Sequence, residues 1–138
     1  MGKSQRDKGF GFERAIAREI REMGIEAKRG FQTRGGTAEE PDVKGVGRLW
    51  IECKAHKKVN RRAAWIQAFE AAPVDHVAVA ICKDDYQKPV VVLPLWAIHP
   101  APEDVEVQDV DEIPLVEIQW EYFKQYLLRK VAGLGEGA

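Results

Sequence analysis

The stretch of sequence that decides the fold reads PDVKGVGRLWIECK and runs from Pro41 to Lys54. It joins a Pro-Asp pair, ending at Asp42, to a Glu-x-Lys triplet that begins at Glu52. Side chains two residues apart in a strand point to the same face, so Glu52 and Lys54 emerge together. Two glycines between the pair and the triplet allow a tight turn that folds Asp42 back beside Glu52. The stretch therefore predicts two neighbouring strands that bring two carboxylates and one ammonium to a single place.

This combination of side chains is suited to one kind of chemistry. Carboxylate oxygens bind hard cations such as Mg²⁺, and an adjacent lysine can serve a phosphate and its attacking water. The three side chains therefore indicate a metal-dependent nuclease. The histidines His56, His76 and His99 stand alone, without His-x-Glu or His-x-x-x-His spacing, so a zinc site is not expected.

A further carboxylate lies in the helix predicted over residues 10–23. Ile16, Ala17 and Ile20 fall on one side of that helix, and Glu13 falls within the same apolar stripe. A charge in this position is costly unless it is paired or binds a metal. The alternative is a glutamate that reaches solvent at the start of the helix, helped by the helix dipole. The downstream stretch favours the metal interpretation.

The composition limits the class of protein. A chain of 138 residues predicts one domain, 1–138, that can bury a sizeable core. No apolar run approaches the roughly 18 residues of a membrane span, and no signal peptide is apparent. Cys53 and Cys82 are the only cysteines, each in a predicted strand. A disulfide framework is therefore not expected, and the expectation is a cytoplasmic protein without a membrane partner.

The charge is divided unevenly along the chain. The net charge of −1 alone argues against a nucleic-acid partner, but residues 1–63 carry 16 Lys/Arg and 9 Asp/Glu, whereas residues 64–138 carry 5 and 13. This division predicts one basic face that meets phosphate, although such asymmetry also arises by chance in small domains. A basic cluster follows the Glu-x-Lys triplet directly, at Lys57, Lys58, Arg61 and Arg62. We interpret it as a phosphate contact; the alternative is a solvated helix start.

The rest of the pattern predicts an alternation of helices and strands. Strands are expected at 25–29, 42–45, 49–55, 77–82, 90–93 and 115–118, and further helices at 61–72 and 119–131. Residues 1–8 and 133–138 are expected to be frayed, and 100–112 to be irregular. The loop 30–40 holds two adjacent glycines and can lie against a phosphate or be an ordinary connection. A helix between two strands of one sheet requires a crossover, so the fold class is α/β with a mixed sheet.

Three aromatic residues and one leucine of the last predicted helix recur at helical spacing, namely Trp120, Phe123, Tyr126 and Leu127. Trp65 lies in the apolar stripe of the helix before it. Tryptophan can stack on unpaired bases, but we expect Trp65 and Trp120 to pack in the core.

The order of helix with Glu13, Pro-Asp, Glu-x-Lys, helix and strand resembles the PD-(D/E)xK nuclease superfamily with its restriction-endonuclease-like fold. Within it, the chain is similar to archaeal-type Holliday junction resolvases and their phage-encoded relatives. Those begin with Lys-Gly-x-x-x-Glu-Arg, here KGFGFER from Lys8 to Arg14, and have a strand ending in an arginine, here Arg29. The resemblance covers about residues 8–93. It implies a mixed central β-sheet flanked by helices.

The resemblance also implies roles for individual residues. Asp42 and Glu52 would bind Mg²⁺, which Mn²⁺ may replace, with help from the Cys53 backbone carbonyl. Glu13 would complete or orient the metal shell, and Lys54 would position and polarise the attacking water. Polar residues expected near the DNA are Lys8, Arg29, Thr33, Arg34, Lys57, Lys58, Arg61 and Arg62, with Gln67 as an accessory candidate. The serine that the family often carries in its loop is absent, and Thr33 or Thr37 stands in its place.

We therefore expect a resolvase that nicks four-way DNA junctions in symmetric pairs and acts as a homodimer. Its nuclease core would span about 8–97, and the strand and helix of 112–131 would be an added element available for dimerisation. A restriction- or repair-type endonuclease acting on duplex or flap DNA would use the same residues and stays open. A non-catalytic nucleic-acid-binding module is the second alternative; the intact set of Glu13, Asp42, Glu52 and Lys54 argues against it.

Overall fold

The computed structural model describes residues 3–30, 40–99 and 109–135, with side chains from Lys8 onward. A six-stranded sheet forms its centre, with strands in the order β1-β2-β3-β4-β5-β6. The strands are β1 (Lys28–Arg29), β2 (Val43–Lys44), β3 (Leu49–His56), β4 (Val77–Asp84), β5 (Val90–Pro94) and β6 (Leu115–Gln119). The pair β3–β4 is parallel and the other neighbouring pairs are antiparallel. The sheet is therefore mixed, as predicted.

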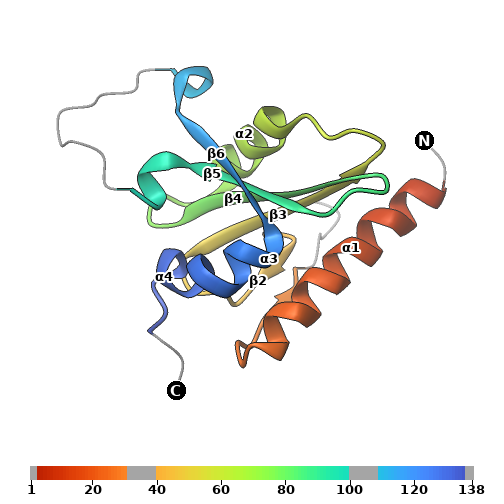
Figure 1. Ribbon diagram of the computed structural model, residues 1–138, viewed down its shortest axis with the longest axis horizontal. Helices are drawn as coiled ribbons and strands as arrows, with labels where there is room; N and C mark the ends of the chain where they lie inside the picture. Colours follow the sequence, from red (N-terminus) through yellow and green to blue (C-terminus); the bar gives the residue numbers. More distant parts are fainter. Residues whose placement is uncertain (1–2, 31–39, 100–108, 136–138) are drawn as a thin grey trace.

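Helices cover both faces of this sheet (Figure 1). On one face lie α1 (Lys3–Glu22) and the C-terminal helices α3 (Trp120–Tyr122) and α4 (Leu128–Ala132), which share a core with the sheet. On the other lies α2 (Arg61–Ala71), which has a core of its own. Because α2 connects the parallel strands β3 and β4, it is the crossover that parallel pairing requires. The predicted fold class, α/β with a mixed central sheet flanked by helices, is confirmed.

Strand β3 divides its side chains between the two cores with the expected period of two. Leu49, Ile51 and Cys53 belong to the core under α1, and Trp50 belongs to the core under α2. Strand β4 is buried on both faces, as its run of small apolar residues predicts. Glu52 and Lys54, which share the parity of Trp50, therefore lie on the α2 side of β3.

Two N-terminal elements differ from the prediction. Helix α1 begins at Lys3, not near residue 10, because a polar segment rich in Lys, Gln and Arg still favours a helix. The strand expected over 25–29 is reduced to Lys28–Arg29. The Ala27 backbone N–H donates to the Ile25 carbonyl at 2.8 Å, so strand pairing cannot begin before Lys28. Between 100 and 112, the described part contains a 3₁₀ turn, η2 (Val110–Glu112), and a second one, η1 (Leu95–Ala97), follows β5.

The C-terminal helix is interrupted, which corrects its predicted apolar stripe. A π-helical segment, η3 (Phe123–Leu127), separates α3 from α4. The wider π turn shifts the helical face by one residue, so Leu128 takes the buried position expected for Leu127, and Tyr126 is 67% exposed. Trp120 and Phe123 are buried in the protein's own core, as is Trp65. The packing predicted for Trp65 and Trp120 is therefore confirmed, and the use of residues 112–131 for dimerisation stays a prediction.

Candidate active site

Asp42 lies where β2 separates from β3. Its backbone N–H donates to the Ile51 carbonyl at 2.9 Å, and its Oδ2 accepts from the Cys53 backbone N–H at 2.8 Å. The turn that follows β2 needs glycine: Gly45 has φ of 87°, and a Cβ there would lie 2.5 Å from the Glu26 carbonyl oxygen. The predicted turn therefore exists, and it places the Asp42 carboxylate against the backbone of β3.

Glu52 reaches the same place from β3. The side chain is almost fully buried, and it is hydrogen-bonded to Asp42. The Trp50 indole N–H donates to Glu52 Oε1 at 3.1 Å. Burial, followed by the charge of Asp42, raises the pKa of Glu52 to about 8, against the smaller opposing effects of Trp50 and Lys54. The two carboxyl groups are thus held in contact despite their mutual repulsion.

Glu13 approaches Asp42 from α1, on the opposite side of the sheet. Its Oε2 accepts from Arg29 Nη2 at 3.2 Å and Nε at 3.3 Å, and the Arg29 guanidinium lies 5.0 Å from the centre of the Phe10 ring. Burial, followed by the charge of Asp42, raises the pKa of Glu13, and the Arg29 hydrogen bond lowers it. The alternative of a glutamate that reaches solvent at the start of the helix is wrong, because α1 begins at Lys3 and only 13% of the Glu13 side chain is exposed. The carboxylate is instead ion-paired with Arg29 and contacts Asp42.

Glu13 and Glu52 each contact Asp42, but the three carboxylates do not form one compact group. Within the described parts of the chain, no three side chains among His, Cys, Asp and Glu are grouped as a set of metal ligands. Glu13 is paired with Arg29, and its predicted part in completing or orienting the metal shell stays a prediction. Mg²⁺ typically uses one or two protein carboxylates and completes its shell with waters and substrate phosphates. Asp42 and Glu52 are a donor set that fits such an ion.

Two residues of the triplet region contribute in different ways. Lys54 is half-buried on the same face of β3 as Glu52, and its charge acts to lower the pKa of Glu52. The Cys53 thiol is buried, and burial and then the Asp42 charge raise its pKa, so it stays neutral. A neutral thiol is a poor ligand for a hard cation. The proposed use of the Cys53 backbone carbonyl stays a prediction.

The predicted DNA-contacting residues are not brought together as one basic face. Arg61 pairs with Asp84 at 2.7 Å and with Glu117 at 3.2 Å, and Arg62 donates to the Ile113 carbonyl at 3.1 Å. Both arginines therefore have partners within the fold, and their contact with phosphate stays a prediction. Lys8 likewise pairs with Asp85 at 2.7 Å. The remaining members of this set are the exposed Lys57 and Lys58, the Glu13 partner Arg29, and Thr33 and Arg34, which lie outside the described residues.

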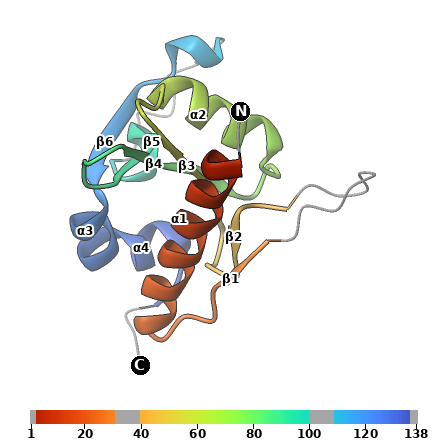
Figure 2. The same ribbon diagram turned by 90° about the vertical axis from the view of Figure 1, so that its right-hand side faces the viewer.

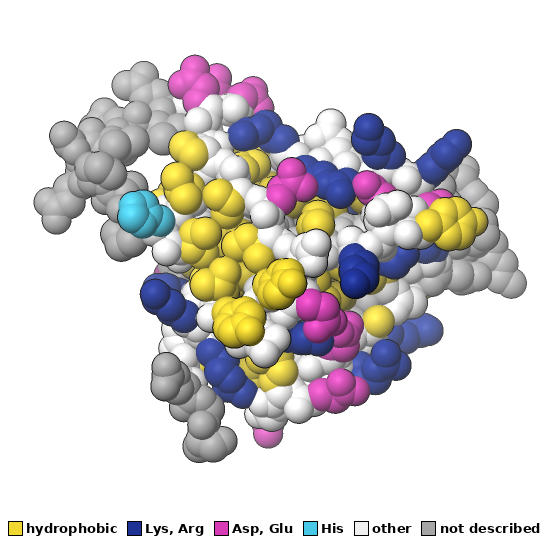
Figure 3. All heavy atoms as spheres, viewed as in Figure 1, with side chains coloured by type: hydrophobic (Ala, Val, Ile, Leu, Met, Phe, Trp, Pro, Cys, Tyr) yellow, Lys and Arg dark blue, Asp and Glu magenta, His cyan; other side chains and the backbone are white. Residues whose placement is uncertain are grey.

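The uneven charge of the chain is the reason for this difference. The acidic C-terminal half supplies partners to the basic N-terminal half, as in Lys8–Asp85 and Arg61–Glu117. Basic and acidic side chains are accordingly interspersed on the face shown in Figure 3. Gln67 is exposed, two residues from the fully buried Trp65 and so on the opposite side of α2. Its accessory role stays a prediction.

Trp50 is a site residue that the sequence analysis missed. It lies two positions before Glu52, on the same strand face, so the period of a strand could have indicated it. It is the donor that fixes one oxygen of a buried carboxylate. Figure 2 shows the surroundings of the site, with α1 lying across the sheet and β1 and β2 at its side.

Comparison with known proteins gives a limited result. No protein-family model matches the chain, and no curated protein matches it in sequence. Among solved structures, the chain is similar to Hjc, a Holliday junction resolvase from the archaeal hyperthermophile Archaeoglobus fulgidus, with 19% identity and a TM-score of 0.46. The similarity covers 91% of this chain and 100% of that chain. At this level it does not carry an activity over, and the function has to be inferred from the site itself. None of the described helices is both long and apolar enough to span a membrane.

Proposed function

We propose that this protein is a Mg²⁺-dependent, structure-selective DNA endonuclease, a Holliday junction resolvase that introduces paired symmetric nicks into four-way DNA junctions. One observation carries the proposal: Asp42 and Glu52, from neighbouring strands, are buried in hydrogen-bond contact, with Glu13 acting on Asp42 from α1. Below a pH of about 8 Glu52 is protonated and can share its proton with Asp42, and at higher pH the two negative charges weaken the fold unless a cation neutralises them. Clusters of this kind are typical of functional sites.

Asp42 and Glu52 would hold the Mg²⁺ ion, with the Cys53 backbone carbonyl as a further donor. A bound Mg²⁺ supplies Lewis-acid chemistry and charge neutralisation to a phosphodiester. The hydrogen bond from Trp50 to Oε1 and the Cys53 N–H bond to Asp42 Oδ2 each hold one oxygen of a carboxylate in place. Glu13 would orient Asp42. These contacts hold the donor set rigid before substrate arrives, which is the condition for accurate positioning.

Lys54 would act on the substrate. Its ammonium emerges on the Glu52 side of β3, where it can donate to an oxygen of the scissile phosphate and hold the attacking water in line. It would also stabilise the negative charge that develops on the phosphate during attack. The expected products carry 5′-phosphate and 3′-hydroxyl ends, as the family resemblance implies. Lys57 and Lys58, exposed just beyond the end of β3, would bind neighbouring phosphates without sequence preference.

A second copy of this chain is the partner that the proposed reaction requires. A four-way junction has two-fold symmetry, so two symmetric nicks need two matched sites, which a C₂ homodimer supplies. Apolar side chains are exposed on the sheet edge and helices around β6, in particular Leu95, Trp96, Tyr122 and Tyr126. Figure 3 shows hydrophobic side chains gathered over this part of the molecule. This surface, and not the buried stripe of the last helix, would form the interface.

The test is cleavage of a labelled synthetic four-way junction beside a linear duplex made of the same arms. Wild type and Asp42→Ala are compared in Mg²⁺ and in EDTA, with Asp111→Ala as a matched control on the exposed turn η2. Paired symmetric nicks in the junction alone, lost in EDTA and in Asp42→Ala but kept in Asp111→Ala, are the expected result. Equal cutting of junction and duplex would instead indicate a general duplex nuclease. Binding without cutting would indicate a non-catalytic module.

A further inference from the structure

Tyr86 lies at the tip of the hairpin between β4 and β5, at the third position of a turn that the Gln87 N–H closes on the Asp84 carbonyl at 3.1 Å, where glycine or asparagine is usual. Its φ is 63°, in the left-handed region that is uncommon for residues other than glycine and unfavourable for bulky ones. Its side chain is 99% exposed, so no buried contact offsets this conformation. An unfavourable backbone and a fully exposed aromatic ring at one position are reasons to look for a ligand.

The turn that carries Tyr86 is anchored on three sides. The Asp84 carboxylate pairs with Arg61 of α2 at 2.7 Å, and the Asp85 carboxylate pairs with Lys8 of α1 at 2.7 Å. The Asp85 backbone N–H donates to the carbonyl of His56, at the end of β3, at 3.0 Å. The turn is thus attached to the same helix and strand that carry Glu13 and Glu52, and the ring is presented from a fixed base.

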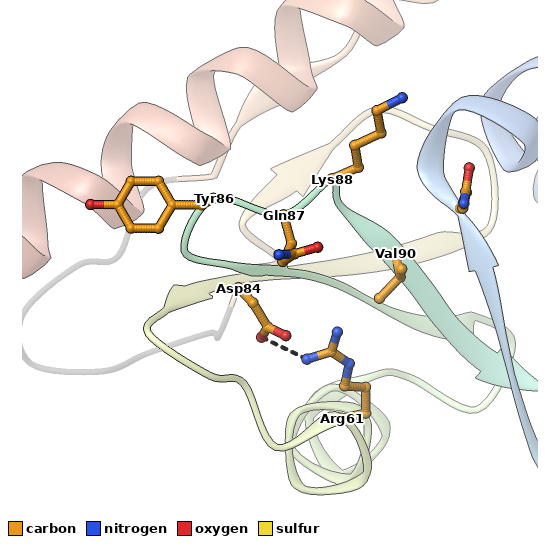
Figure 4. Close-up of a pocket in the computed structure, with 7 residues that line it drawn as sticks. Arg61, Asp84, Tyr86, Gln87, Lys88 and Val90 are labelled. Atoms are coloured by element: carbon orange, nitrogen blue, oxygen red, sulfur yellow. Dashed lines mark hydrogen bonds and ion pairs between the residues drawn. The ribbon is translucent and has the colours of Figure 1, made fainter.

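The direction of the ring is visible in Figure 4. Gln87 and Lys88, together with the Asp84–Arg61 ion pair, line an open hollow of about 690 Å³. Tyr86 belongs to the rim of this hollow, and its ring points away from the ion pair. The ring is therefore directed into solvent at the end of the sheet, where a bound molecule can contact it.

The distance from the candidate site suits a nucleic acid. The register places Glu52 beside Ala80 and His56 beside Asp84. The hairpin tip therefore begins four strand residues beyond Glu52, about 13 Å at about 3.3 Å per residue. One strand of B-DNA advances about 3.4 Å per nucleotide, so this length equals about four nucleotides. A DNA strand that is bound at the carboxylates and continues past Lys57 and Lys58 reaches Tyr86.

We propose that Tyr86 stacks on an unpaired or unstacked DNA base about four nucleotides from the scissile phosphate, and that this contact selects branched over continuous duplex DNA. The inference rests on the proposed function, which it deepens by naming a specificity residue. Every base offers a face for aromatic stacking, so the contact needs no sequence preference. A continuous duplex keeps these faces covered by neighbouring base pairs, whereas a branch point exposes them. An anchored ring also loses little conformational freedom on binding.

The test measures binding in EDTA, where no cutting takes place. Wild type, Tyr86→Ala and Tyr86→Phe are titrated with a four-way junction and with a linear duplex, each carrying 2-aminopurine at successive positions. Val74→Ala is the matched control, because Val74 is a fully exposed apolar residue in the turn at the opposite end of β4. Tyr86→Ala is expected to weaken junction binding by about tenfold or more and to leave duplex binding unchanged. Tyr86→Phe and Val74→Ala should bind as wild type does, and the 2-aminopurine signal should change at one position only when residue 86 has a ring.

Two results would overturn the inference: equal junction affinity for wild type and Tyr86→Ala, or an equal loss for junction and duplex. The second result would show a general surface contact. Failure of the proposed function is seen separately, as wild type that does not nick any substrate in Mg²⁺. Because the binding measurement needs no cleavage, it tests the role of Tyr86 whether or not the wild-type protein nicks DNA.

Discussion

Charged side chains are arranged in opposite ways at the candidate active site and at the ion-pair cluster of Arg61, Asp84 and Glu117, which lies near the ends of β3 and β4. At the candidate site, Asp42 and Glu52 are buried against each other, and burial and the charge of Asp42 raise the pKa of Glu52 to about 8. Four residues further along, Asp84 is paired with Arg61, whose hydrogen bond lowers the pKa of Asp84 while the pKa of Arg61 is raised. When Glu52 is ionised, the first arrangement destabilises the fold and favours the binding of a cation. The second arrangement stabilises the fold, because each charge already has a partner. The comparison therefore separates two carboxylates that are buried against each other from a carboxylate that is already paired with an arginine.

The largest effect is expected for Asp42→Asn, which tests whether the negative charge of Asp42 at the candidate site is needed. The substitution keeps an acceptor for the Cys53 N–H but removes the charge. We expect Mg²⁺-dependent cleavage to fall by more than about a hundredfold, since even outer-shell partners of a metal contribute about 10–100-fold. The same change relieves repulsion with Glu52, so the melting temperature without Mg²⁺ should stay equal or rise. Cleavage assays and thermal melts check both parts. A variant that loses activity because it unfolds would contradict the prediction.

The pH dependence of the free energy of unfolding tests the raised pKa of Glu52 directly. The Glu52 carboxyl ionises near its usual pKa of 4.5 in the unfolded chain but only near 8 in the folded protein. Between these values the folded state binds the extra proton, so stability is fully present below about pH 4.5 and is lost as the pH rises through about 8. The slope should be at most about 1.4 kcal/mol per pH unit for one group. Urea unfolding at pH 5.5 and 8.5 measures it.

Mg²⁺ and Glu52→Gln serve as the controls for that experiment. At pH 8.5 saturating Mg²⁺ should restore stability, by about 2.7 kcal/mol at a hundred times its dissociation constant. Glu52→Gln should flatten the pH dependence and abolish the response to Mg²⁺. If wild type and Glu52→Gln show the same slope, another group is responsible.

A third experiment separates the two kinds of basic residue that lie beyond β3. Arg61→Ala should lower the melting temperature, because it leaves Asp84 and Glu117 without their partner, while DNA affinity changes little. Lys57→Ala with Lys58→Ala should leave the melting temperature unchanged and weaken binding to all DNA forms. The slope of log affinity against log salt should fall by about 1.8, since each lost phosphate contact removes about 0.9. If Arg61→Ala weakens DNA binding and leaves the melting temperature unchanged, Arg61 contacts DNA.

The sequence predicted where the carboxylates of the candidate site lie better than it predicted their surroundings, for physical reasons. Asp42, Glu52 and Lys54 follow from local rules, namely the period of two in a strand and a glycine turn. Glu13 follows from helical periodicity. The partners of Arg61 are set by the pairing of β4, β5 and β6, which no local pattern contains. The π-helical segment at Phe123–Leu127 was missed because a regular helix and an interrupted one share the same spacing up to that point.

The smallest expected effect concerns the strain at Tyr86. Tyr86→Gly should raise the free energy of unfolding by up to about 1 kcal/mol, because glycine accepts a positive φ without the steric cost of a Cβ. The larger conformational freedom of glycine in the unfolded chain offsets part of this gain. Tyr86→Ala, which keeps the Cβ, should not be stabilised, so the pair isolates the backbone contribution from loss of the ring. Chemical denaturation of the three proteins provides the measurement. If Tyr86→Gly is more stable yet loses the preference for junctions, the strained turn is kept for binding and not for folding; if Tyr86→Gly is destabilised, the ring has a structural contact and the conformation needs no ligand to explain it.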